Sequence, residues 1–112
     1  MTVGIAVFLR FPELGRVKTR IAATLGPERA LAVYERLLAQ TLAVVDALPN
    51  AFAVTLFGEP STPLERYLDR FRSPSRRIAL QEGPTLGDRL LGACRHVLAE
   101  SDSVLCIGTD CP

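Results

Sequence analysis

The chain has 112 residues and a formal net charge of +1, with 48% hydrophobic and 22% charged residues. These values fit one small globular domain, and the low charge excludes a global basic field for nucleic acid or an anionic membrane. No apolar stretch is long enough to cross a bilayer, and three cysteines without a Cys-x-x-Cys motif, together with no signal-peptide pattern, predict a cytoplasmic protein.

The first half of the chain predicts one strand followed by two helices. The continuous apolar run at 3–9 is typical of a strand buried on both faces, as in a parallel sheet. Residues 15–26 predict a short helix closed by Gly26, and Pro27 can open the next helix at its first position. The second helix has one apolar stripe at helical spacing, formed by Leu31, Tyr34, Leu38, Leu42, Val45 and Leu48.

The second half of the chain alternates strands with helices. Apolar runs predict three further strands, at 51–58, 77–82 and 103–108. Thr62 is expected to cap a helix that ends near Phe71, and a looser capping signal at 85–88 opens the last helix. The apolar face of that helix comprises Leu86, Leu90, Cys94, Val97 and Leu98. This order predicts an α/β domain with a mainly parallel sheet and flanking helices.

The segment FLRFPELGRVKTR at 8–20 places positive charge where the first strand should turn into a helix. A helix N-terminus offers unpaired backbone N–H groups and the positive end of the helix dipole, so this junction favours a phosphate cradle. The residues that would form it are Gly15, Arg16, Lys18 and Arg20. A solvated basic helix face is the alternative. Neither the P-loop pattern nor Gly-x-Gly-x-x-Gly is present.

Two further positions are candidates for a ligand site. Asp110 follows the last predicted strand, and its carboxylate could hold Mg²⁺ or Mn²⁺ beside a diphosphate, because these cations prefer hard oxygen ligands. From the residues alone, a role in shaping the turn before Pro112 is the stronger alternative. Gly87, at the start of the last helix, permits close approach of a ligand or, equally, a tight turn. His96 is expected to be exposed, and no nucleophilic triad is recognisable.

Three segments together, FLRFPELGRVKTRIA, QEGPTLGDRL and IGTDCP, resemble the radical-SAM/selenodomain-associated transferases, a bacterial glycosyltransferase-like family. The resemblance spans all 112 residues but only the first half of such a domain. It implies the N-terminal part of a GT-A fold, the fold of nucleotide-diphospho-sugar transferases, with a nucleotide-sugar donor and Mg²⁺ or Mn²⁺. It also implies nucleotide-phosphate contacts for Gly15, Arg16, Lys18, Arg20 and Gly87, and metal ligation by Asp110.

Other functions remain open from the sequence. The segment GRVKTR is also similar to the AKTRL-type loop of guanylyltransferases that act on small phosphorylated acids, and a non-catalytic nucleotide-binding fragment is a third alternative. Because the chain stops just after a strand, residues 1–112 are expected to be the nucleotide-binding portion of one longer domain, inactive alone. An open sheet edge would favour a homo-oligomer. The sequence identifies neither the acceptor nor a catalytic base.

Overall fold

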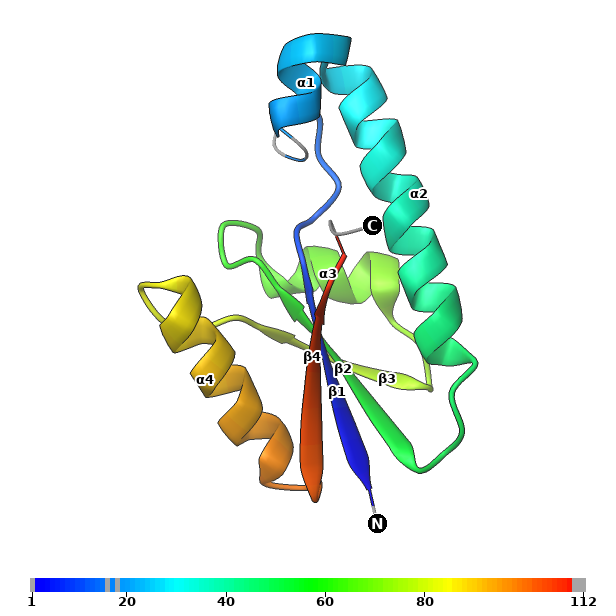
Figure 1. Cartoon of the computed structure of the whole chain (residues 1–112), viewed down its shortest axis with the longest axis vertical. Helices are drawn as coiled ribbons and strands as arrows, with labels where there is room; N and C mark the ends of the chain where they lie inside the picture. The colour runs from blue at the N-terminus through cyan, green and yellow to red at the C-terminus, as the bar shows by residue number, and fades with distance from the viewer. Residues whose placement is uncertain (1, 16, 18, 110–112) are drawn as a thin grey trace.

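The computed structural model describes residues 2–15, 17 and 19–109, and it describes 19–21 by their backbone alone. Strands and helices alternate along this part of the chain, as the sequence predicts (Figure 1). In chain order the elements are β1 (Val3–Leu9), α1 (Thr19–Leu25), α2 (Pro27–Asp46), β2 (Phe52–Gly58), α3 (Leu64–Phe71), β3 (Arg76–Leu80), α4 (Leu86–Leu98) and β4 (Ser103–Gly108).

The four described strands form one parallel sheet in the order β3-β2-β1-β4. In the register, Val3 of β1 lies between Phe52 of β2 and Ser103 of β4. The chain therefore builds outward from β1 in one direction and then returns to add β4 on its other side. All the strands end at the same edge of the sheet, which points toward α1 in Figure 1. The predicted α/β class is confirmed.

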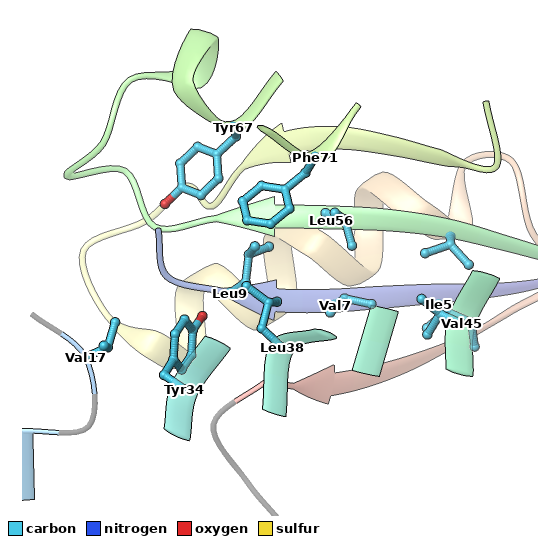
Figure 2. Close-up of a cluster of buried hydrophobic side chains, with 11 residues drawn as sticks. Ile5, Val7, Leu9, Val17, Tyr34, Leu38, Val45, Leu56, Tyr67 and Phe71 are labelled. Atoms are coloured by element: carbon cyan, nitrogen blue, oxygen red, sulfur yellow. The ribbon is translucent and has the colours of Figure 1, made fainter. Parts of the chain in front are cut away.

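Helices α2 and α3 cover one face of the sheet and bury the larger core. Figure 2 shows Tyr34 and Leu38 of α2 and Tyr67 of α3 directed toward the apolar side chains of β1 and β2. The residues of the predicted stripe are all buried or half-buried, but Leu48 lies two residues past the end of α2. Gly26 and Pro27 separate α1 from α2 where the sequence predicts the break. Two-sided burial of β1 explains its continuous apolar run.

Helix α4 covers the opposite face and approaches the sheet closely (Figure 1). A β-carbon placed on Gly4 of β1 would lie 2.0 Å from Cγ1 of Val97, so the helix can reach this distance only over a glycine. The predicted apolar face of this helix is partly wrong. Leu86 and Leu98 are 65% and 46% exposed, whereas Val97, which was predicted, and Ala93, which was not, are buried against the sheet.

Three local expectations differ from the structure or are refined by it. Thr62 does not cap α3, whose N-cap is Pro63, and no side chain caps this helix by a hydrogen bond. Helix α1 begins at Thr19, four residues after the predicted start at residue 15, and β3 ends at Leu80 rather than residue 82. Thr85 is the N-cap of α4, as predicted, and its hydroxyl accepts a hydrogen bond from the N–H of Asp88 at 3.1 Å.

The strand that ends the described chain is less buried than its apolar sequence predicts. Within residues 2–109, β4 pairs with β1 alone, and Leu105 in its middle is 56% exposed. Partial burial follows from its place at the edge of the sheet, since only β1 and α4 contact it closely. Among the described residues, no helix is both long enough and apolar enough to span a membrane.

Candidate functional site

A cleft of about 420 Å³ opens at the carboxyl edge of the sheet, beside the point where the strand order reverses. In open α/β sheets this is the position at which ligands bind, because the loops after the two central strands diverge there. The cleft is bounded by the ends of β1 and β4, the residues after β2 and β3, and the first turn of α4. It is lined by Phe8, Leu9, Arg10, Tyr34, Glu59, Gln81, Leu86, Arg89, Leu90, Cys106, Ile107, Gly108 and Thr109.

Tyr34 on α2 joins the end of β1 to the end of β4. Its hydroxyl accepts a hydrogen bond from the N–H of Arg10 (2.8 Å) and donates one to the carbonyl oxygen of Arg10 (2.7 Å). The buried hydroxyl of Thr109 lies 3.0 Å from the Tyr34 hydroxyl and donates to the carbonyl oxygen of Phe8 at 3.2 Å. The chain after β4 therefore faces the loop after β1 as far as Thr109, the residue that precedes Asp110.

Replacing Tyr34 by phenylalanine is expected to lower the free energy of unfolding by about 2 kcal/mol, because the hydroxyl's buried partners lose their hydrogen bonds. Urea denaturation followed by circular dichroism measures the change. Thr41→Ala is the matched control, since its hydroxyl donates only to the carbonyl oxygen of Leu37 within α2, and it should cost under about 1 kcal/mol. Equal losses for the two variants would show that Tyr34 does not hold the strand ends together.

Glu59 and Arg89 form an ion pair across the cleft, which the sequence analysis did not identify. Nη1 of Arg89 lies 3.4 Å from both carboxylate oxygens of Glu59, and each side chain is 25% exposed. Nε of Arg89 donates to the carbonyl oxygen of Gly83, which fixes the guanidinium. Glu59 directly follows β2, so the rule that polar residues just past parallel strands form sites would have selected it. The sequence could not show that Glu59 pairs with Arg89, because the fold brings α4 to the end of β2.

Gln81, just after β3, is a buried polar residue at the same cleft. Its Nε2 donates to the carbonyl oxygen of Phe57 at 3.0 Å, and its backbone N–H donates to that of Gly58 at 2.9 Å. These bonds fix the amide in one orientation. A fixed amide of this kind can select among ligands by hydrogen bonding, because burial raises the cost of an unmatched partner.

A second, more polar hollow of about 370 Å³ adjoins the cleft and shares Arg10 and Glu59 with it. It lies between the loop after β1 and the loop after β2, and Gly15, Ser61 and Thr62 contribute to its lining. Gly15 has a φ of 78°, a conformation that side-chain-bearing residues rarely adopt. Gly15 therefore lines this second hollow.

Side chains of helix α3 pack against the loop after β1 and hold it in place. The ring of Phe11 packs edge-on against Tyr67, with 5.5 Å between centroids, and the guanidinium of Arg66 lies 4.3 Å over it. Arg66 also pairs with Glu13 at 3.0 Å. The Tyr67 hydroxyl donates to the carbonyl oxygen of Glu59 at 2.9 Å, and burial raises its pKa, so it stays a neutral donor. Both loops at the mouth of the site are thus held before any ligand binds.

The structure describes only part of the predicted basic and acidic site. Arg16, Lys18 and Asp110 lie outside the described residues, and Arg20 lies in α1 with its side chain undescribed. Gly87 is in the first turn of α4, and a β-carbon there would meet only Oγ1 of Thr85, at 3.8 Å. No close approach in the chain itself therefore requires glycine at this position.

The described residues offer few of the oxygen ligands that Mg²⁺ and Mn²⁺ require. Residues 2–15, 17 and 19–109 contain no group of three or more His, Cys, Asp or Glu side chains placed to hold an ion. Among the described residues that line the cleft, Glu59 carries the only carboxylate, and Arg89 pairs with it. A hard cation beside a diphosphate uses one or two carboxylates plus phosphate oxygens and water. A metal here would therefore depend on Asp110 and on the ligand's own oxygens.

No family model and no curated protein sequence matches the chain. Among solved structures it is similar to a protein from Desulfovibrio desulfuricans G20 that carries a provisional assignment as a nucleotide-diphospho-sugar transferase, with a TM-score of 0.86 and 26% identity. The match covers 98% of this chain and 48% of that one, so this chain spans about half the length of the solved structure. The likeness supports the nucleotide-diphospho-sugar transferase superfamily that the sequence motifs indicate.

Proposed function

We propose that this chain supplies the nucleotide-binding part of a glycosyltransferase-like enzyme that uses a nucleotide-sugar donor with Mg²⁺ or Mn²⁺. The observation that carries the proposal is the cleft where the strand order reverses, in a chain whose fold matches a protein assigned to that class. The narrower radical-SAM/selenodomain-associated family and a cytoplasmic location belong to the same proposal.

In this proposal the cleft receives the nucleoside. The Glu59 carboxylate accepts hydrogen bonds from ligand N–H or hydroxyl groups, and the Arg89 guanidinium donates to ligand oxygens. Leu86, exposed at the cleft, offers an apolar contact to the face of a base. Because the two charges of the ion pair already neutralise each other, the cleft suits an uncharged nucleoside better than a phosphate.

The diphosphate is assigned to the basic loop. Transfer of a sugar leaves negative charge on the departing diphosphate, and fixed cations stabilise that charge. The protein would supply these cations from Arg16, Lys18 and Arg20. A divalent metal, bound with help from Asp110, would act as a Lewis acid toward the same leaving group.

Lys18 is the only lysine in the sequence, so an amine-reactive label tests the basic loop directly. If the loop binds phosphate, a saturating nucleoside diphosphate should slow acetylation of Lys18 about tenfold or more. Mass spectrometry of the digested protein measures the rate, and the α-amino group serves as the internal control. The nucleoside without phosphate should leave Lys18 unprotected. An unchanged Lys18 rate with the diphosphate would remove this loop from the site.

A nucleotidyltransferase is the second candidate, favoured by the likeness of residues 15–20 to a guanylyltransferase loop. The two functions share one fold, which cannot decide between them. Release of pyrophosphate from a nucleoside triphosphate by the enzyme that contains this chain would assign the second. Nucleotide binding with neither reaction would assign the non-catalytic alternative.

We propose a second copy of the chain as the partner of the β4 edge. Within the described sheet the two edge strands differ: β3 carries Arg76 and Arg77, both in ion pairs, whereas β4 carries no charged residue. Charged side chains protect edge strands against pairing, and β4 lacks that protection. In an antiparallel pair centred on Leu105, the two leucine side chains would cover each other.

Leu105→Lys should therefore weaken self-association about tenfold or more, because a charge replaces apolar surface that the pair would bury. Sedimentation velocity over a range of protein concentrations measures the effect. Leu25→Lys is the matched control, since Leu25 at the end of α1 is similarly exposed, at 51% against 56%. A wild-type chain that stays monomeric at high concentration would contradict the proposal.

A further inference from the structure

Two free cysteines lie next to each other on α4 and β4, which both line the cleft, and the proposed function does not use them. Sγ of Cys94, on α4, lies 3.5 Å from Sγ of Cys106, on β4. Both thiols are free and neither is fully buried, and Cys106 lines the main cleft. We propose that Cys94 and Cys106 form a reversible disulfide that fastens α4 to β4 when a low-molecular-weight disulfide oxidises the protein.

The packing around the pair explains why the two sulfur atoms meet. Ala6 of β1 is the register partner of Cys106, and Ala93 precedes Cys94 on the helix; both alanines are buried. Together with Gly4, these small residues let α4 lie close to the sheet. A disulfide requires about 2.0 Å between sulfur atoms, so the two must approach by about 1.5 Å, which is within reach of side-chain rotation and a small shift of the helix.

The reaction is thiol–disulfide exchange in two steps. Cys94 as thiolate attacks a sulfur of the small disulfide, whose S–S bond breaks and releases one thiol. Cys106 then loses its proton to solvent and attacks Sγ of Cys94, which releases the second small thiol and closes the protein disulfide. Two protein thiols are oxidised and one small disulfide is reduced. Burial and the contact with Cys94 raise the pKa of Cys106 to about 11, so the first attack is assigned to Cys94.

The bond would connect two walls of one cleft. The first turn of α4 contributes Leu86, Arg89 and Leu90 to the lining, and β4 contributes Cys106 and Ile107. A covalent link between these elements limits how far the walls can separate. In a reducing cytoplasm the thiols are the resting state, so the link would form only when the pool of small disulfides rises.

The test uses the full chain with Cys111→Ser, which leaves Cys94 and Cys106 as its only thiols. After equilibration with oxidised glutathione, we expect the loss of two hydrogen atoms in the intact mass and a peptide link between Cys94 and Cys106. We also expect a rise in Tm of about 5–10 °C that dithiothreitol reverses. Nucleotide is not needed, so the result is independent of the proposed function.

The controls add Cys94→Ser or Cys106→Ser to the same background. The Cys106→Ser variant should take up one glutathione at Cys94, and neither variant should form an internal disulfide or show a rise in Tm. The proposal is overturned if the Cys111→Ser protein keeps both thiols, carries two glutathiones, or links one chain to another. Because the parent protein alone can give any of these results, a control that fails to fold does not weaken the test.

Discussion

Replacing Gly58 by alanine is expected to lower the free energy of unfolding by about 3 kcal/mol, a large part of the stability of a small domain. A β-carbon at this position would lie 2.6 Å from two ring atoms of Tyr67 and 2.8 Å from a third. The ring cannot retreat, because it is fully buried and packs against Phe11 and Phe71. Its hydroxyl also holds the carbonyl oxygen of Glu59.

Urea denaturation compares Gly58→Ala with Gly87→Ala, which is the matched control. A β-carbon at Gly87 meets only a hydroxyl at 3.8 Å, and alanine is the better helix former, so this variant should be neutral or more stable by up to about 1 kcal/mol. If Gly58→Ala falls within about 0.5 kcal/mol of wild type, the contact between β2 and Tyr67 is looser than the structure indicates.

The Gly87→Ala control also bears on the ligand site. Sequence resemblance assigns Gly87 to the nucleotide site, whereas the chain itself leaves room for a side chain there. If Gly87→Ala binds nucleotide more weakly but is as stable as wild type, the bound ligand, and not the chain, requires glycine at this position. Unchanged affinity would mean that this glycine serves only the start of α4.

Asp110→Asn is expected to abolish the enhancement of nucleotide binding by Mn²⁺. In the wild-type chain Mn²⁺ should tighten nucleoside diphosphate binding about tenfold or more, because the cation neutralises the diphosphate while a carboxylate holds it. The amide keeps the shape of the side chain and removes its charge. Binding without metal should change little, since the basic residues between 16 and 20 are untouched.

Calorimetric titrations with and without Mn²⁺ on wild type, Asp110→Asn and Asp69→Asn measure this effect. Asp69 is exposed on α3, so the same substitution there should leave the enhancement intact. If Mn²⁺ still enhances nucleotide binding fully in Asp110→Asn, this aspartate does not bind the metal and only shapes the turn. The proposed metal site would then lose its only protein ligand, because the described part of the cleft offers no carboxylate outside an ion pair.

The sequence by itself determined the elements of this protein. The continuous run at 3–9 reflects burial of β1 on both faces, and the stripe on α2 repeats at the 3.6-residue period of a helix with one buried face. Gly26, Pro27 and Thr85 mark helix ends through their own backbone and side-chain chemistry, so local reasoning placed them correctly. Thr62 failed as a cap because α3 begins at Leu64, one residue later than a Thr62 cap requires, so Pro63 takes the N-cap position.

Only the tertiary structure decided which residues meet. Placing β1 between β2 and β4 brings Thr109 to Tyr34, 75 positions away, and packing α4 over glycine and alanine brings Arg89 to Glu59 and Cys94 to Cys106. The sequence located the edge of the sheet at which the candidate cleft opens, because parallel strands all end there. It could not give the pairs, because strand order and helix position are set by the packing of the whole chain, which no local periodicity records.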